Sequence, residues 1–183
     1  MEWWDIFTRT LATEFSDISD LEEAFSVAIR LTLAMILGGL LGYEREYKGK
    51  AAGLRTHMLV CVGAALFVLV PLKAGIVQDD VSRVIQGVVT GVGFLGAGTI
   101  LKGGERREVQ GLTTAAGIWL TAAVGVASGL GHETTAVLTT LLALMVLMVM
   151  RPLERHAAAS AARHRKRQRR KQAQAQAQAS RDA

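Results

Sequence analysis

Five long apolar segments, separated by short polar stretches, dominate the middle of the chain. They cover residues 24–41, 56–71, 84–101, 112–130 and 134–150. A helix needs about 20 mostly apolar residues to cross a bilayer, and each segment approaches that length. The pattern therefore predicts an all-α fold, a polytopic transmembrane helix bundle of five spans with Gly-rich central helices. Four spans are the alternative, in which the third and fourth segments form a re-entrant pair.

Two polar segments flank this predicted transmembrane domain, which covers residues 24–150. Residues 1–23 carry seven acids and one base, and five large apolar side chains recur there at helical spacing: Trp3, Trp4, Phe7, Leu11 and Phe15. This acidic amphipathic segment is either a helix on the membrane surface, where Trp is common, or a frayed leader. Residues 151–183 carry ten bases and two acids and form a basic, low-complexity tail.

The positions of the basic residues predict an orientation. Lys and Arg concentrate after the first, third and fifth apolar segments and are sparse in the two alternate loops. Basic loops stay in the cytoplasm, and these three stretches share one side only if there are five spans. The sequence thus predicts a multi-pass protein with its N-terminus outside and its C-terminus in the cytoplasm. The polybasic run 163–171 is expected to touch anionic lipid, and nucleic acid is an unlikely partner.

The sequence contains no recognisable enzymatic motif. A single cysteine, Cys61, excludes a disulfide framework or a cysteine-built metal cluster, and the four histidines are not spaced as a metal pair on one helix face. No phosphate-binding loop is present, and the GxGxxG string that begins at Gly91 lacks the flanking strand that a dinucleotide site needs. We therefore predict a non-enzymatic protein with no cofactor, no catalytic residues and no metal site.

Arg30 is the most unusual single residue, because it lies about two turns inside the first apolar segment. A charge at that depth costs about 2.5–3.5 kcal/mol on insertion scales, so it should face the bundle and be paired. The candidate partners on the outer side are Asp79, Asp80 and Glu133. The alternative is an arginine that extends to the membrane surface without a partner.

Glycines are dense in the third apolar segment, where Gly91, Gly93, Gly96 and Gly98 follow Gly87. The Gly87-xxx-Gly91 pair predicts the close approach of two helices. A broken helix that forms a ligand site near the bilayer midplane is the other interpretation.

Three polar groups at helix ends are further candidates for binding a ligand or a partner. Glu44 and Arg45 lie in the charged stretch after the first segment, and Arg55, Thr56 and His57 lie where the second begins. A helix start can hold an anion or a carboxylate, and Glu44 or Glu46 could supply the carboxylate from within the protein. Thr113 and Thr114 begin the fourth segment, where hydroxyls cap the helix or bond to a neighbour.

Several of these residues belong to short motifs in a defined order between residues 25 and 131. The motifs are Gly42-Tyr43-Glu44-Arg45-Glu46, Ala52-Gly53-Leu54-Arg55-Thr56-His57, Val62-Gly63-Ala64, Gly91–Gly98, Val109–Ala116 and Trp119. In this order the chain resembles the membrane domain of the MgtC/SapB family of bacterial inner-membrane proteins. It resembles a short form, because residues 151–183 are too few and too low in complexity to build the soluble C-terminal domain of the founding member.

The resemblance implies a protein of the bacterial inner membrane that is linked to low-magnesium adaptation and, in pathogens, to intracellular survival. It implies a regulator or adaptor whose partners are lipids and other inner-membrane proteins, with the ATP synthase, a magnesium-transport ATPase and a second copy of the chain as candidates. A small transporter or channel, with a path past Arg30 and residues 91–98, is the competing hypothesis. The absence of acidic residues inside the predicted spans argues against a cation path.

Overall fold

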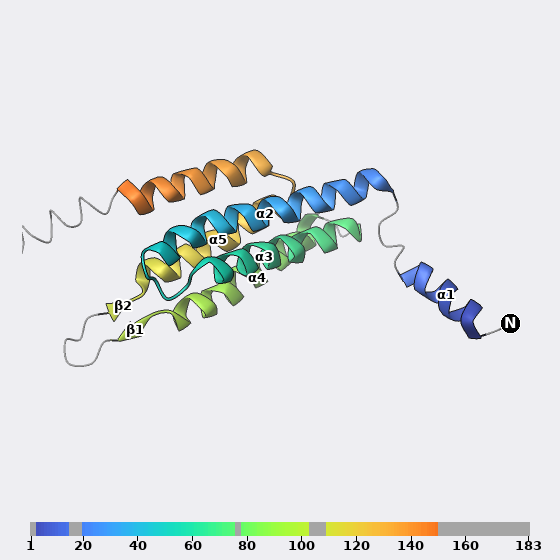
Figure 1. The fold of residues 1–183 in the computed structure, drawn as a ribbon, viewed down its shortest axis with the longest axis horizontal. Helices are drawn as coiled ribbons and strands as arrows, with labels where there is room; N and C mark the ends of the chain where they lie inside the picture. Colours follow the sequence, from blue (N-terminus) through green and yellow to red (C-terminus); the bar gives the residue numbers. More distant parts are fainter. Residues whose placement is uncertain (1–2, 15–19, 76–77, 103–108, 150–183) are drawn as a thin grey trace, which may run out of the picture. The chain divides into compact units, whose positions relative to one another are not determined.

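A computed structural model describes residues 3–14, 20–75, 78–102 and 109–149. The chain divides into two compact units, Met1–Leu141 and Leu142–Ala183, and the second is described only as far as Val149. The labelled helices are α1 (Trp3–Glu14), α2 (Leu21–Tyr47), α3 (Leu54–Lys73), α4 (Gln78–Gly98) and α5 (Leu112–Gly129), and a further helix covers Glu133–Val149 (Figure 1). Two short strands, β1 (Leu101–Lys102) and β2 (Val109–Gln110), pair antiparallel between α4 and α5.

The predicted all-α membrane architecture is confirmed. Within the described residues, four helices are long and apolar enough to cross a membrane: α2, α3, the Asp80–Gly98 part of α4, and α5. The helix Glu133–Val149 is apolar but shorter than these within the described residues. The count of five spans therefore stays a prediction. The 21 residues of α4 and the 18 of α5 form unbroken helices, which favours two crossings over a re-entrant pair.

Local signals explain where α2 and α5 begin. The Asp20 carboxylate accepts a hydrogen bond of 2.7 Å from the backbone N–H of Glu23, so it caps α2 in the way that Asp favours. Gly111 precedes α5 with a φ of 93°, and a side chain there would collide with the Thr99 carbonyl oxygen. Only glycine adopts that conformation at low cost, which fixes the sharp turn from β2 into α5.

The N-terminal segment forms a helix, which agrees with the prediction of an amphipathic helix rather than a frayed leader. α1 has no buried residue, and its aromatic side chains Trp3, Trp4 and Phe7 are exposed and contact one another. An exposed aromatic face on a short amphipathic helix is typical of a segment that lies in the membrane interface. Membrane binding by α1 stays a prediction, and the basic tail lies outside the described residues.

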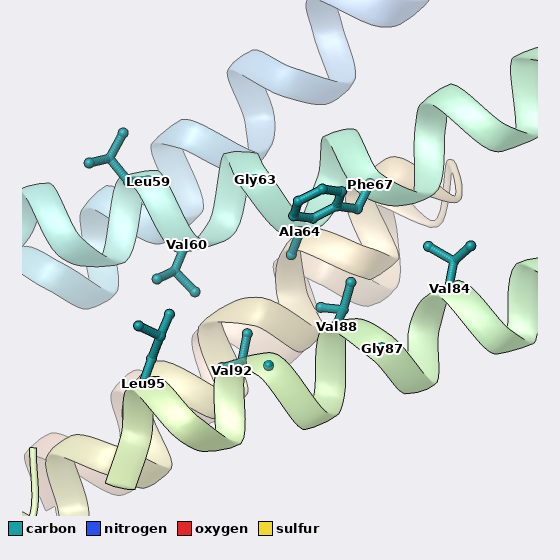
Figure 2. Close-up of a pocket in the computed structure, with 11 residues that line it drawn as sticks. Leu59, Val60, Gly63, Ala64, Phe67, Val84, Gly87, Val88, Val92 and Leu95 are labelled. Atoms are coloured by element: carbon teal, nitrogen blue, oxygen red, sulfur yellow. The ribbon is translucent and has the colours of Figure 1, made fainter. Parts of the chain in front are cut away.

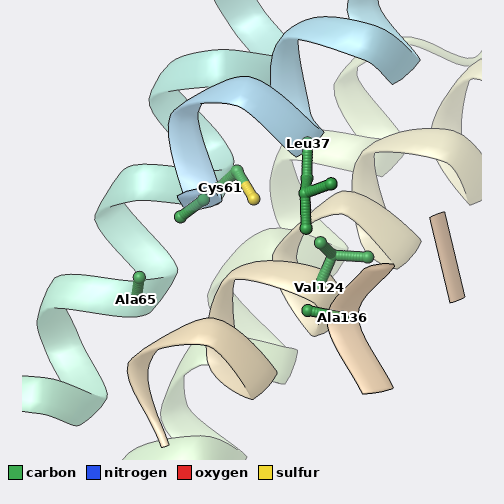
Figure 3. Packing of buried hydrophobic residues seen from close by; sticks show 6 residues of the cluster. Leu37, Cys61, Ala65, Val124 and Ala136 are labelled. Atoms are coloured by element: carbon green, nitrogen blue, oxygen red, sulfur yellow. The ribbon is translucent and has the colours of Figure 1, made fainter. Parts of the chain in front are cut away.

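Helix α3 is central in the first unit, where it packs against α2, α4 and α5. One cluster of buried side chains joins Leu37 of α2, Cys61 and Ala65 of α3, Val124 of α5 and Ala136 (Figure 3). A second cluster joins α3 and α5 to Val92 of α4. Most of these side chains are small, so the helix backbones come close together, as is usual for packing within a bilayer.

Two glycine pairs produce the closest helix contacts. Gly38 and Gly42 of α2 face α3, and an added Cβ would lie 2.7 Å from the His57 carbonyl oxygen at Gly38 and 2.7 Å from the Leu54 Cα at Gly42. Gly125 and Gly129 of α5 meet α3 from another side, where an added Cβ would press on the carbonyl oxygens of Cys61 and Ala65. These spacings are the small-xxx-small pattern, and α3 packs against both pairs.

The glycines of α4 make few contacts within the described chain. The close approach predicted at Gly87 and Gly91 does not occur within the described part of the chain, because a Cβ at either position would meet nothing within 4 Å. Packing of a partner helix on these glycines stays a prediction. The broken-helix interpretation is wrong, since α4 continues unbroken to Gly98. Gly96 alone among the four predicted site glycines touches a neighbour, with an added Cβ 3.4 Å from the Ala115 carbonyl oxygen.

Candidate functional site

A buried ion pair lies near the C-terminal end of α2. Glu44 and Arg45 are only 3% and 4% exposed, and both Nε and Nη2 of Arg45 contact Oε2 of Glu44. The other carboxylate oxygen, Oε1, is buried without a hydrogen-bond partner among the described residues. The two opposite charges compensate each other, and each would be costly to bury alone.

His57 lies in the first turn of α3 and is fully buried. Its Nδ1 donates to the carbonyl oxygen of Gly53 at 3.0 Å, because a carbonyl can only accept. When the imidazole is neutral, Nε2 is therefore its unprotonated nitrogen, and this atom is buried and has no partner in the described chain. A Cβ built at Gly117 of α5 would come within 3.6 Å of this nitrogen, so the ring faces α5.

The loop between α2 and α3 explains why these groups are close together. The Glu46 carboxylate accepts a hydrogen bond of 2.8 Å from the backbone N–H of Leu54, and so caps the first turn of α3. The glycine at position 42 lets α2 approach that same turn. The prediction that a carboxylate of the chain itself occupies this helix start is confirmed, and of its two candidates, Glu44 and Glu46, the structure selects Glu46.

The structure separates the other predicted polar residues into two groups. Thr114 is buried on α5, one turn before the glycine that faces His57. Arg55, Thr56 and Thr113 are exposed. Among the predicted glycines, Gly91, Gly93 and Gly98 are exposed on α4 and lie outside the buried polar cluster of Glu44, Arg45 and His57. Gly117 was not predicted, because only the tertiary structure shows that it faces His57.

The buried polar cluster can bind a hydrogen-bond donor. Its charged pair is neutral overall, and its two open atoms, Glu44 Oε1 and His57 Nε2, are both acceptors when the imidazole is neutral. No group of three or more His, Cys, Asp or Glu side chains in the described residues could hold a metal ion. The cluster therefore presents acceptors to a hydrogen-bond donor.

Arg30 bridges α2 to the other end of α5. Its Nη1 donates to the carbonyl oxygen of Gly129 at 3.3 Å, and its Nε lies 3.6 Å from Oε1 of Glu133. Glu133 is one of the three acids proposed as partners from the sequence. Gly131 turns the chain between them with a φ of 81°, and an added Cβ would lie 2.7 Å from Nη2 of Arg30. The guanidinium thus binds a helix C-terminus and an acid at once, a favourable position for a cation.

We expect Arg30→Lys to lose function nearly as fully as Arg30→Ala, with protein levels largely kept. A lysine is a point charge on a flexible stem and does not reproduce a planar fork that serves two acceptors. Complementation of a deletion strain, with membrane levels measured by immunoblot, checks this. Glu133→Gln serves as the matched variant, since it removes only the charge of the acid. A fully active lysine variant would show that any cation suffices at this position.

An open apolar groove lies between α3 and α4. It encloses about 550 Å³, and Figure 2 shows that side chains of both helices line it. Its lining includes Leu59 and Phe67 of α3, and Val88 and Leu95 of α4, with glycines at 63, 87 and 91. Gly87 and Gly91 have no side chain to fill the space between α3 and α4, so the groove stays open.

Comparison with known proteins places most of the described residues in one family. Residues 31–156 match the MgtC family. The chain is 43% identical over 142 residues to Protein SrpB of Synechococcus elongatus, 46% identical over 132 residues to the putative magnesium transporter YhiD of Escherichia coli, and 40% identical over 127 residues to Protein MgtC of Salmonella typhimurium.

These matches cover about 70% of the chain but different shares of the relatives. They include 72%, 68% and 69% of this chain, and 78% of SrpB, 60% of YhiD and 53% of MgtC. The matched region thus spans little more than half the length of two of these relatives. No solved structure matches the chain.

Proposed function

Because the chain belongs to the MgtC family of membrane proteins, which is linked to magnesium transport or homeostasis, we propose that it is a non-enzymatic regulator or adaptor of other membrane proteins. The family resemblance inferred from the short motifs is confirmed by the match over residues 31–156. The proposal extends to low-magnesium adaptation and intracellular survival as the setting, and to a magnesium-transport ATPase or the ATP synthase as candidate partners.

The observation that carries this proposal is the groove between α3 and α4. It is lined by apolar side chains and glycine, and Gly63, Gly87 and Gly91 each leave open space where a Cβ would stand. Inside a bilayer the hydrophobic effect does not drive helices together, so association depends on close packing through small residues. A spanning helix of another protein with a small-residue face fits a groove of this kind.

The arrangement of charge supports an adaptor over an ion carrier. Three of the four described ion pairs lie at helix ends: Glu44–Arg45 near the end of α2, Lys73–Glu23 between the end of α3 and the start of α2, and Arg83–Asp80 in the first turns of α4. In the fourth pair, Arg30 lies inside α2 but its guanidinium reaches Glu133 beside the end of α5. Between them the packing clusters consist of apolar side chains such as Leu37, Cys61 and Val124. Transport paths for cations place ionisable groups at depth.

A small transporter is the second candidate function, and one observation favours it. Glu44 Oε1 and His57 Nε2 are buried acceptors that the described chain leaves without donors. Buried polar atoms are normally paired, and exceptions concentrate at functional sites. A transported species with hydrogen-bond donors would find partners there.

Two assays on the full chain distinguish the candidates. A photo-crosslinking residue at Leu95, in the groove, should form a discrete adduct with another membrane protein in native membranes, whereas the same residue at the exposed neighbour Phe94 should not. Purified protein in liposomes should leave magnesium flux at the level of empty vesicles, with an ionophore as the positive control. Flux that Glu44→Gln abolishes would instead establish the transporter.

We further propose that the protein resides in the bacterial inner membrane with its N-terminus outside and its C-terminus in the cytoplasm. The loop charges support this orientation. A reporter enzyme that is active only in the cytoplasm should be active when fused after Ala183, and inactive when inserted at Gly75, in the turn that follows α3. Activity of a periplasm-specific reporter fused after Ala183 would contradict this orientation.

A further inference from the structure

We propose that α4 carries a second interface, separate from the groove, through which two copies of this chain associate in the membrane. The interface consists of five exposed residues on one side of the helix: Ser82, Gln86, Thr90, Gly93 and Ala97. At about 100° per residue, these five positions fall within an arc of about 80°. We call this set the polar stripe of α4.

All five residues of the polar stripe are exposed in the described part of the chain. The side of α4 that packs inward is formed by Val81, Val92 and Gly96, which are buried. The groove occupies a third side, with Gly87 and Gly91 in its lining. Gln86 and Thr90, one turn apart on a spanning helix, would thus be left in contact with lipid. Polar side chains within spans normally face a protein interior or a water-filled cavity, so this arrangement indicates a missing protein partner.

Gln86 is the residue that most requires a partner. It lies six residues inside the start of the Asp80–Gly98 span, or about 9 Å along the helix. Its side chain makes no hydrogen bond within the described chain, whereas Thr90 satisfies its own hydroxyl by donating to the Gln86 carbonyl oxygen at 2.8 Å. An amide in hydrocarbon without a partner is costly, since it has both a donor and an acceptor to satisfy.

The chemistry of the polar stripe points to a second copy as the occupant. Two copies have the same orientation in the membrane, so a twofold axis along the membrane normal brings a residue near the helix crossing against itself. An amide is self-complementary, because each copy can donate to and accept from the other. The stripe carries no charge that would repel its own copy. Gly93 and Ala97 continue the stripe with small side chains that allow two backbones to approach.

Cysteine crosslinking in native membranes tests the interface with a matched pair of variants. Gly93 and Gly91 are both exposed glycines of α4 with nothing within 4 Å of an added Cβ, but only Gly93 lies on the polar stripe. Oxidation should convert Gly93→Cys into a covalent dimer and leave Gly91→Cys monomeric. The buried Cys61 of the unmodified chain supplies the unreactive control. Crosslinking of both variants, of neither, or of Gly93→Cys only to a different protein would overturn the proposal.

A second measurement addresses the amide itself. Gln86→Leu should weaken self-association about 3- to 30-fold in liposomes, measured by energy transfer between labelled copies as lipid dilutes them, while Gln86→Asn should retain most of it. Phe94→Leu, an exposed apolar change outside the stripe, is the control. An unchanged dimer in Gln86→Leu would contradict the proposed contact. Loss of the groove adduct at Leu95 would affect the proposed adaptor role and leave this interface intact.

Discussion

Arg45→Met is expected to destabilise the protein by about 3–5 kcal/mol, because it leaves the Glu44 carboxylate buried without its counter-charge. That loss is a large fraction of the stability of a typical fold. For a chain of this size it corresponds to a fall of roughly 6–20 °C in the unfolding midpoint. Thermal unfolding of purified protein in detergent, followed by the fraction that stays monodisperse, measures the effect.

The double variant with Glu44→Met and Arg45→Met provides the decisive comparison. It removes both charges together, so we expect it to recover much of the stability that the single change loses. Arg55→Met is the control, since Arg55 is exposed on the neighbouring helix and its replacement should change stability by no more than about 0.5 kcal/mol. A double variant less stable than Arg45→Met would contradict this explanation, because removing the unpaired carboxylate should relieve the cost of burying it.

Adding a single methyl group at Gly125 should destabilise the protein, whereas the same change at Gly91 should not. A Cβ at Gly125 would press on the Cys61 carbonyl oxygen. Because this oxygen belongs to the backbone of α3, the clash is relieved only if α5 and α3 move apart. We expect a cost of about 1–3 kcal/mol or more for Gly125→Ala. At Gly91 a Cβ meets nothing within 4 Å. Because alanine has a higher helix propensity than glycine, Gly91→Ala should raise the stability by up to about 1 kcal/mol.

The two glycine variants are therefore predicted to shift the unfolding midpoint in opposite directions. Gly38→Ala should follow Gly125→Ala, since its Cβ would lie 2.7 Å from both Cys61 Cβ and the His57 carbonyl oxygen. Thermal unfolding of the three variants under one set of conditions checks the order. Equal destabilisation at positions 91 and 125 would show that α4 packs more tightly than the described contacts indicate.

Much of the architecture could be predicted because it depends on local properties of the sequence. The length of each apolar run fixes which helices can span a bilayer, and α2, α3, α4 and α5 lie where those runs predicted them. The cost of a charge inside a span also made Arg30 a residue that needs a partner, and Glu133 was among the few acids near enough to the helix ends.

Other features required the tertiary structure. The sequence singled out Gly87 and Gly91 for close packing, yet α3 packs tightly against the glycine pair at positions 38 and 42 and the pair at 125 and 129. All these glycines share the same four-residue spacing. Spacing defines a helix face but does not say which face meets another helix.

The buried polar cluster shows the same division between sequence and tertiary structure. Charge and position made Glu44, Arg45, Arg55 and His57 equal candidates in one loop region, and the structure buries three of them and exposes Arg55. Apolar length and charge cost act within a segment, so the sequence by itself determined the spans and the need to pair Arg30. Burial depends on the register between helices far apart in the chain, and only the tertiary structure decided which glycines and charges lie inside.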